Sequence, residues 1–188
     1  MALFTAGRDG VPLCHDIESS LLPLQANAVY FERYLYERIH QTTTNFLDSY
    51  NQEKVSKDIK ALSATLTPDC KRYYLPISIV SYAPALAAGS TNEQYETQMQ
   101  PEFSEVWDHW HSEVKDVVVD VRARKSVSDM ITYMTTKKGK KYEFEMVFKL
   151  QLTDDGTKVS KVEEFVDTAL AGQVIADNQA IQEALQLK

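Results

Sequence analysis

Cysteine is scarce in this sequence: only Cys14 and Cys70 occur among 188 residues. The two lie far apart and form no Cys-x-x-Cys spacing, so the sequence indicates neither a disulfide framework nor a cysteine-based metal site. This usage is typical of a reducing compartment, and we expect a cytoplasmic protein. Cys70 is expected to act as a small buried hydrophobe.

Long apolar runs are also absent from the sequence. No window approaches the length of a membrane span, and residues 1–10 lack the basic start and long apolar segment of a secretion signal. No internal repeat or low-complexity segment occurs. We therefore expect a soluble protein with one main domain and no membrane partner.

Positive charge is in deficit. The chain has 20 Lys and Arg residues against 27 Asp and Glu residues, and its formal net charge is −7. A protein that binds nucleic acid by neutralising phosphates needs the opposite balance, so we expect no nucleic-acid partner. The one basic cluster, residues 137–141, lies where a turn between strands is expected. We interpret it as an exposed hairpin tip, with binding to an anionic partner as the alternative.

The last third of the chain contains a clear strand pattern. Apolar and polar residues alternate over 142–152, which is typical of a half-buried antiparallel strand. An Asp-Asp-Gly turn follows, and residues 159–167 then predict a returning strand in which Glu164 shares a face with Val162 and Val166. A carboxylate turned toward an apolar cavity is costly unless it is paired or neutralised, and such groups serve as general acids and bases.

Helical periodicity precedes strand periodicity along the chain. After an irregular arm, helices are expected at 27–50, 55–66 and 91–110, the last with a break at Pro101. Strands are expected at 72–75, 117–121, 130–135, 142–152 and 159–167, followed by a helix over 169–187. This order predicts an α+β domain with helices on one face of an antiparallel sheet. A bent sheet would leave a conical cavity, the usual place for a small-molecule site.

The ending of the second strand resembles that of a known family. Residues 156–167, Gly-Thr-Lys-Val-Ser-Lys-Val-Glu-Glu-Phe-Val-Asp, are similar to the closing pattern of the cone-shaped NTF2-like and SnoaL-like proteins. These include ketosteroid isomerase, scytalone dehydratase and limonene epoxide hydrolase. The resemblance implies an NTF2-like cone at 27–170, a strongly bent antiparallel sheet wrapped on three N-terminal helices. Residues 1–26 would be an added arm and 171–188 a C-terminal helical extension.

The same resemblance implies a set of site residues. Glu164 matches the family's cavity acid, while Arg72 and Tyr74 match cavity positions on the first short strand, so these three are the expected catalytic residues. Asp167 would lie at the rim. The expected substrate-binding residues, mostly aromatic or apolar, are Tyr50, Trp107, Trp110, Tyr133, Phe144, Met146, Phe148, Val162 and Val166.

The chain also departs from individual branches of the family. Epoxide hydrolases of this type need an Arg-x-Asp pair where this sequence reads Ile131-Thr132-Tyr133, which argues against epoxide hydrolysis. The two histidines His109 and His111 do not fall on the pattern of scytalone dehydratase, and we expect no metal site from them. The oxyanion hole of ketosteroid isomerase has no clear counterpart.

Each candidate site residue could instead have a purely structural role. Glu164 could face solvent and pair with Lys161 or Lys149, and the tyrosines and tryptophans could be ordinary core residues. A closed apolar cavity that contains Glu164 would favour an enzyme, whereas a filled core with Glu164 in solvent would favour an interaction module.

The resemblance implies a cofactor-independent acid/base enzyme. Its expected reaction is isomerisation, cyclisation or dehydration of a small apolar oxygenated natural-product intermediate, as in fungal secondary metabolism. The alternative is a non-catalytic NTF2-like module that binds a ligand or associates with proteins. Residues 117–121 offer apolar side chains on both faces of their strand, so we also expect a homodimer through the sheet.

Overall fold

The computed structural model of the protein describes residues 15–186. Cys14, and the part of the expected arm before it, lie outside the described residues. The chain divides into two compact units, Met1–Tyr34 and Leu35–Lys188. The sheet and the candidate site belong to the second unit, whose arrangement is described below.

Helix α1 (His15–Ser56) begins within the segment that we expected to be irregular. Residues 15–26 are helical, so that expectation is wrong for them. In the second unit α1 buries one face, since apolar residues recur at spacings of three and four. These buried residues are Leu35, Ile39, Phe46, Leu47 and Tyr50.

Five strands form a single sheet in the order β1-β5-β4-β3-β2. They are β1 (Leu66–Leu75), β2 (Trp107–Asp120), β3 (Lys125–Thr136), β4 (Lys141–Leu152) and β5 (Val159–Val166). Strands β2 to β5 pair antiparallel in sequence order, whereas β1 pairs parallel to β5. The sheet is therefore mixed, and the expectation of a purely antiparallel sheet is wrong at this edge. The segment between β1 and β5 contains helices and the strands β2 to β4, and its length permits the parallel pairing.

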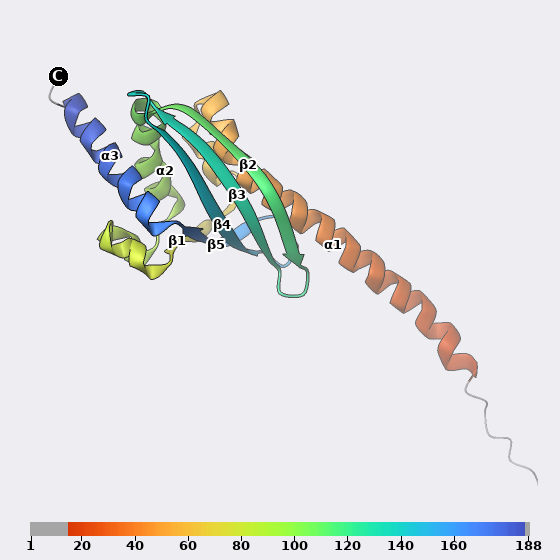
Figure 1. Ribbon diagram of the computed structural model, residues 1–188. Coiled ribbons are helices and arrows are strands. Elements are labelled where there is room, and N and C mark those ends of the chain that lie inside the picture. The colour runs from red at the N-terminus through yellow and green to blue at the C-terminus, as the bar shows by residue number, and fades with distance from the viewer. Residues whose placement is uncertain (1–14, 187–188) are drawn as a thin grey trace, which may run out of the picture. The chain divides into compact units, whose positions relative to one another are not determined.

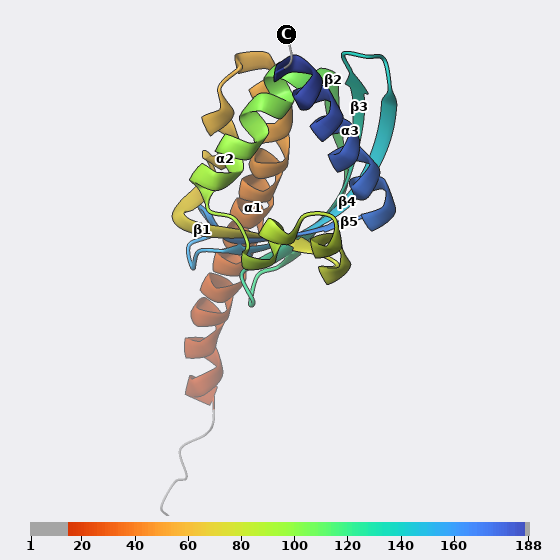
Figure 2. The same cartoon turned by 90° about the vertical axis from the view of Figure 1, so that its left-hand side faces the viewer.

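The sheet presents one face to the helices. Residues of β3, β4 and β5 alternate between buried and more exposed, as the period-two pattern predicted. Figure 1 shows β2, β3 and β4 running side by side along a bent surface. In Figure 2 the sheet curves around α2 and α3, which lie on the same side of it as the part of α1 that belongs to the second unit. The three helices and the curved sheet agree with the predicted α+β cone.

The second predicted helix is much shorter than expected. A 3₁₀ helix, η1 (Ile59–Ser63), occupies its centre and is capped by the Asp58 side chain, which accepts a hydrogen bond from the Lys60 N–H. Strand β1 already starts at Leu66 and runs through Pro68, which we expected to end a helix. Proline is compatible with this strand because β1 lies at the sheet edge, where one side of the backbone has no strand to bond.

The third predicted helix ends earlier than expected. Helix α2 (Asn92–Pro101) starts with a capping box between Thr91 and Gln94, and a single π-helical turn, η4 (Glu102–Val106), follows it. Strand β2 then begins at Trp107, so the prediction of a helix up to residue 110 is wrong. Proline cannot donate the backbone hydrogen bond that regular continuation would use, which accounts for the break at Pro101.

A bulge at the start of β2 explains the misleading spacing of the tryptophans. Trp107 pairs with Thr136 and His109 pairs with Thr135, so two residues of β2 oppose one residue of β3. This extra residue turns Trp107 and Trp110 to the same face, although residues three apart on a regular strand face opposite ways. Their ring centroids lie 5.9 Å apart in an edge-to-face arrangement.

Two tight turns join the later strands. The basic cluster at residues 137–141 forms the turn between β3 and β4, as predicted, with Gly139 at φ +83°. Gly156, at φ +71°, closes the turn before β5 and packs against α1, where Thr42 donates a hydrogen bond to its carbonyl oxygen. Both positions use the left-handed backbone that glycine adopts without strain.

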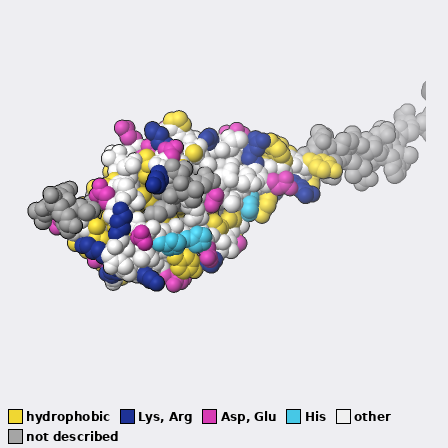
Figure 3. Space-filling view, turned by 90° about the horizontal axis from the view of Figure 1, so that it is seen from above, with side chains coloured by type: hydrophobic (Ala, Val, Ile, Leu, Met, Phe, Trp, Pro, Cys, Tyr) yellow, Lys and Arg dark blue, Asp and Glu magenta, His cyan; other side chains and the backbone are white. Residues whose placement is uncertain are grey.

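The C-terminal helix α3 (Thr168–Gln186) packs on the domain and buries Ala171 and Ile181. Asp167 caps it by accepting hydrogen bonds from the backbone N–H groups of Ala169 and Leu170. Over residues 15–186, no helix has both the length and the apolar character needed to cross a membrane. On the face seen in Figure 3, acidic and basic side chains are interspersed.

Candidate active site

A pocket with a cavity volume of about 120 Å³ lies between the inner face of the sheet and the helices. Its walls are mainly apolar and aromatic, with a few polar side chains, which is the usual character of a small-molecule site. The lining residues are Tyr50, Tyr74, Ile79, Tyr95, Gln98, Met99, Glu102, Trp107, Trp110, Met134, Phe144, Met146, Glu164, Val166, Ala171, Val174, Ile175 and Asn178.

Glu164 lies in the wall of this pocket and is only 6% exposed. Strands β1 and β5 place it next to Arg72, which is 3% exposed. The shortest ion-pair distance, from Arg72 Nη1 to Glu164 Oε2, is 3.4 Å. This is the only hydrogen bond found for the Glu164 carboxylate within the described part of the chain, although a carboxylate has about four acceptor sites. The group therefore keeps acceptor capacity for a ligand.

Arg72 also organises the tyrosines around it. The same Nη1 donates a 2.6 Å hydrogen bond to the Tyr50 hydroxyl, and the Tyr95 hydroxyl lies 3.3 Å from that oxygen. The guanidinium stacks over the Tyr95 ring at 3.7 Å from its centroid. Because Tyr50 accepts from both Arg72 and Tyr95, its own O–H proton is available to donate into the pocket that Tyr50 lines.

Burial controls the protonation of these groups. Burial raises the pKa of Glu164, and the charge of Arg72 opposes that rise. Burial likewise raises the pKa of Tyr50 to about 12, so its hydroxyl stays protonated at neutral pH. The pKa of Tyr74 is raised well above its usual value, first by burial and then by the charge of Glu164. The site thus combines a carboxylate of raised basicity with neutral hydroxyl donors.

No protein-family profile matches this sequence, and no curated protein matches it. Solved structures do match the fold. The BvnE pinacolase from Penicillium brevicompactum is 23% identical, with 78% of this chain and 93% of that chain covered and a TM-score of 0.65. PrhC from Penicillium brasilianum is 23% identical, with 80% and 93% covered and a TM-score of 0.62. An NTF2-like protein from Burkholderia pseudomallei is 16% identical, with 73% and 97% covered and a TM-score of 0.54.

This chain has the NTF2-like fold. The similarity to the two Penicillium structures covers 78% and 80% of this chain and agrees with the resemblance found in the closing strand. At this level of identity the comparison establishes the fold, while the chemistry has to be argued from the residues that line the pocket.

The NTF2-like pocket collects most of the residues that the sequence predicted. Residues from α1, β1, β2, β4 and β5 line it together, although they are far apart in the chain. The predicted residues found in the wall are Tyr50, Tyr74, Trp107, Trp110, Phe144, Met146, Glu164 and Val166.

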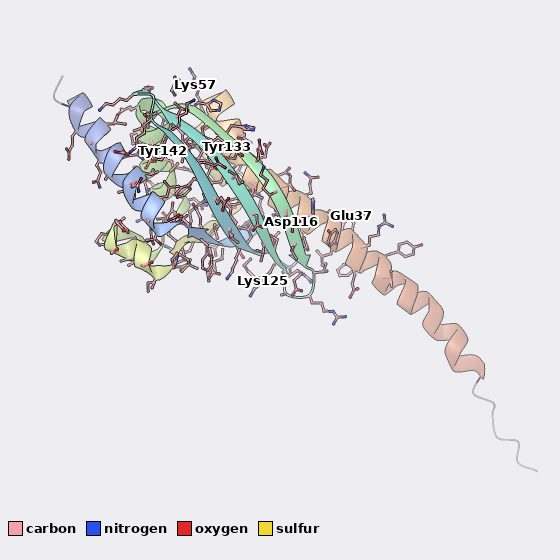
Figure 4. All side chains as sticks on the ribbon, viewed as in Figure 1. Glu37, Lys57, Asp116, Lys125, Tyr133 and Tyr142 are labelled. Atoms are coloured by element: carbon pink, nitrogen blue, oxygen red, sulfur yellow. The ribbon has the colours of Figure 1, made fainter. Side chains whose placement is uncertain are left out.

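The remaining predicted residues lie elsewhere. Phe148 and Val162 are fully buried in the core beside the pocket, where Phe148 packs edge-to-face on Phe46 at 5.6 Å. Arg72 contacts Glu164 from behind the pocket wall. Tyr133, labelled on β3 in Figure 4, lies on the strand face opposite the buried Met134, so its prediction as a pocket residue is wrong.

Glu102 is a pocket residue that sequence reasoning missed. It opens the π-helical turn η4, and its Oε2 accepts a 3.0 Å hydrogen bond from the side-chain amide of Asn178 on α3. Burial raises its pKa to about 7, although hydrogen bonding to Trp107 and Gln98 opposes the rise. A π-helical turn is frequent at functional sites, but no feature of the sequence around Pro101 indicates one.

Helix α3 covers the pocket with Ala171, Val174, Ile175 and Asn178. Its position is fixed from outside as well, because Asp177 accepts hydrogen bonds from Lys140 at the β3–β4 turn and from the Tyr142 hydroxyl. Figure 4 shows Tyr142 on the side of β4 that lies toward α3. The helix predicted over 169–187 is therefore confirmed, and it packs on the body of the domain.

None of the histidine and cysteine side chains that the structure describes lines the pocket. His109 and His111 are exposed on β2, and Cys70 is buried in the core, where burial raises the pKa of its thiol to about 11. Within residues 15–186, no three His, Cys, Asp or Glu side chains are grouped so that they could hold a metal ion.

Proposed function

We propose that this protein is an acid/base enzyme that acts without a cofactor on a small, apolar, oxygenated molecule. The reaction class is isomerisation, cyclisation or dehydration of a natural-product intermediate. One observation carries the proposal: the buried Glu164 carboxylate faces an apolar pocket, is held by a single 3.4 Å contact to Arg72, and lies beside a tyrosine hydroxyl network.

Glu164 is the proposed proton acceptor. Burial makes it a stronger base than a solvated glutamate, while Arg72 keeps the ionised form accessible. Its remaining acceptor sites lie where a ligand in the pocket would present an acidic C–H or O–H group. A positioned base of this kind contributes about 10²–10⁴ in rate.

Tyr50 is the proposed donor to the substrate oxygen. Its hydroxyl accepts from Arg72 and Tyr95, so its proton points away from both and serves an oxygen on which negative charge develops. Arg72, which we expected to be catalytic, then acts as a positioning residue that orients Tyr50 and Glu164 together. Tyr74 extends the polar wall next to Glu164, its partner in the β1–β5 pairing.

The pocket walls support the substrate class. Trp107, Trp110, Phe144, Met146 and Val166 form a broad apolar surface that fits a rigid hydrocarbon skeleton. Two structural neighbours carry the names pinacolase and LEH-like epoxide hydrolase, both of which refer to reactions at carbon–oxygen bonds. These names support the proposal of an oxygenated substrate for this chain.

The alternative is a non-catalytic module. An association module would use the outer sheet face and would leave the inner face as a filled core. The buried position of Glu164 beside a cavity counts against that reading, because an unused buried carboxylate is costly to keep.

A deuterium-exchange assay tests the proposal without the natural substrate. The probe is trans-2-decalone in D₂O, and mass spectrometry follows deuterium entry at the carbons beside its carbonyl group. We expect the wild-type protein to accelerate this exchange, and we expect Glu164→Gln to reduce the acceleration by about 10²–10⁴.

Glu163→Gln is the matched control. Glu163 neighbours Glu164 in β5 but lies on the other strand face, paired with Lys161. This variant should exchange deuterium at the wild-type rate. Equal activity in Glu164→Gln and wild type, with both proteins folded by circular dichroism, would contradict the role of Glu164.

A further inference from the structure

A second carboxyl group, Glu102, belongs to the same pocket as Glu164 but comes from a different part of the fold. Glu164 is carried by β5, and Glu102 by the π-helical turn between α2 and β2. Both residues line the cavity. A ligand that fills the pocket therefore meets two carboxyl groups that approach it from separate elements.

The surroundings of Glu102 are neutral on each element that packs against it. Asn178 of α3 donates a hydrogen bond to it, while Gln98 of α2 and Trp107 of β2 act to lower its pKa, and none of the three carries a charge. Glu164, by contrast, has the guanidinium of Arg72 beside it. The two carboxyl groups therefore differ in kind: one has a buried cationic partner, and the other has only neutral partners.

Tyr74 connects the two groups electrostatically. The charges of Glu164 and Glu102 both act to raise the pKa of the Tyr74 hydroxyl, so this side chain lies within reach of both carboxyl groups. Tyr74 lines the pocket as well. Arg72, whose charge lowers the pKa of Tyr74, lies beside Glu164.

We propose that Glu102 is a second catalytic residue, which donates a proton to one atom of the substrate while Glu164 removes a proton from another. This inference rests on the proposed function, since it divides the acid and base roles of that reaction between two residues. A neutral carboxyl group whose pKa is about 7 suits proton donation near neutral pH.

In one turnover the protein removes one proton from the substrate and donates one proton to it. The Glu164 carboxylate takes a proton from carbon, and the C–H electron pair moves into an enolate whose oxygen accepts a hydrogen bond from Tyr50. The electron pair then shifts to a remote carbon of the conjugated system, which takes the proton from the Glu102 carboxyl group. Glu164 ends protonated and Glu102 ionised, and both return to their starting states by proton exchange with water.

This division of roles specifies the substrate class more closely. The substrate carries its oxygen near Tyr50, and its proton-accepting carbon or leaving group lies near Glu102, across the apolar walls formed by the tryptophans. An extended, conjugated or polycyclic skeleton meets that requirement. A short, fully flexible molecule does not span two fixed groups without a large entropic cost.

Tryptophan fluorescence gives a test that needs no substrate. The chain has two tryptophans, and both line the pocket together with Glu102. Titrations from pH 5 to 9 are made in a His109→Asn, His111→Asn background, because these exposed histidines flank Trp110. We expect a transition near pH 7 that disappears with Glu102→Gln and persists with Glu105→Gln, an exposed control on the same turn. A transition that persists unchanged in Glu102→Gln would overturn the assignment.

A bicyclic β,γ-unsaturated ketone separates the two catalytic steps. Nuclear magnetic resonance in D₂O follows exchange beside the carbonyl group and migration of the double bond as independent rates. We expect Glu102→Gln to slow migration about 10²-fold or more while exchange stays within a few-fold of wild type. Glu164→Gln should slow both steps.

The outcomes distinguish the two proposals. Wild-type migration in Glu102→Gln would overturn the role of Glu102 and leave the acid/base function of Glu164 standing. If the wild-type protein accelerates neither step, both proposals are wrong. If Glu102→Gln loses exchange and migration equally while its unfolding temperature is unchanged, the separate roles are wrong, because Glu102 would then act on the same step as Glu164.

Discussion

Arg72 and Glu164 form a buried ion pair, 3.4 Å apart, between the neighbouring strands β1 and β5. The Arg72 guanidinium also stacks on the Tyr95 ring and donates a hydrogen bond to the Tyr50 hydroxyl. Its Nη2 atom has no hydrogen-bond partner in the described structure. A buried pair of this kind contributes little net stability as a pair, but the loss of one member leaves an uncompensated charge.

Arg72→Met should therefore destabilise the protein by about 3–5 kcal/mol, because Glu164 would remain buried without its cation. Urea unfolding followed by circular dichroism measures the loss. The double variant Arg72→Met, Glu164→Gln should recover part of this stability, since it removes the unpaired carboxylate as well. Strictly additive losses in the two single variants would show that the pair is not coupled.

Glu102 predicts a specific pH dependence of stability. Its folded-state pKa, about 7, lies above the ordinary value of 4.5, so the folded protein holds the proton more tightly than the unfolded chain. The resulting stabilisation is complete below about pH 4.5 and is lost as the pH rises through 7. From the size of the shift, the difference is at most about 3 kcal/mol.

Glu102→Gln should remove this component of the pH profile. Unfolding free energies measured in urea between pH 4 and 8 should fall less steeply for the variant than for the wild type. Glu105→Gln, which changes an exposed carboxylate on the same turn, should keep the wild-type slope. Parallel profiles for wild type and Glu102→Gln would contradict the prediction.

Gly156 lies close to the side chains of Ile39 and Leu35 on α1, so glycine is needed there for space as well as for its backbone conformation. A Cβ atom at this position would lie 2.9 Å from Ile39 Cγ1 and 3.1 Å from Leu35 Cδ1, whereas at Gly139 it would meet open space. Both glycines have positive φ, so alanine strains the backbone at each. We expect Gly156→Ala to cost about 1–3 kcal/mol more than Gly139→Ala, because only the former overpacks the contact with α1. Equal unfolding free energies of the two variants would contradict this reading.

Helix α3 should act as a cover on the pocket. Removal of residues 173–188 takes away Val174, Ile175 and Asn178, so we expect binding of trans-2-decalone, measured by tryptophan fluorescence, to weaken about tenfold or more. The melting temperature of the truncated protein should fall proportionally less than its affinity for trans-2-decalone, because the sheet and α1 remain. Lys140→Ala is a milder companion that releases the outer contacts of Lys140 with Asp177 and with the Tyr142 ring. Unchanged binding by the truncated protein would disprove the role of α3 as a cover.

Homodimer formation through the outer sheet face remains a prediction. Val118 is 60% exposed there and pairs with Val127, which is 39% exposed. Sedimentation velocity at micromolar concentration should show a species of twice 21.4 kDa for the wild type. Val118→Lys should shift the protein to the monomer, because a lysine in an apolar contact loses its hydration. A wild-type protein that sediments only as a monomer would contradict the prediction.

The sequence predicted the later strands well because their alternation is strong. Residues 142–152 and 159–167 were correctly predicted as strands, while the inward direction of Glu164 came from the resemblance to the family. The resemblance to the family then placed Arg72 beside it, 92 residues earlier in the chain. Both inferences depend on a period of two, which the sheet enforces through burial of one face.

The wrong or missed predictions concern residues whose sequence pattern fits more than one local structure. Trp107 and Trp110 have helical spacing, but a bulge gives a strand the same arrangement of side chains. Tyr133 lies in a strand with apolar residues on both faces, so alternation alone did not identify its inner face. Glu102 follows a proline and looks like an ordinary polar residue at a helix end, and only the π-helical turn and Asn178 bring it into the pocket.

The parallel pairing of β1 with β5 also has a consequence for folding. It joins the first strand of the sheet to the last, so Arg72 meets Glu164 across a sequence separation of 92 residues. Contacts across such a sequence separation are slow to form, since closing a long loop costs chain entropy. A compact intermediate that buried β1 before β5 arrived would contain an unpaired guanidinium, which is energetically unfavourable. The ion pair therefore disfavours incomplete sheets, and a chain acquires its proposed proton-transfer site only when the last strand has joined the first.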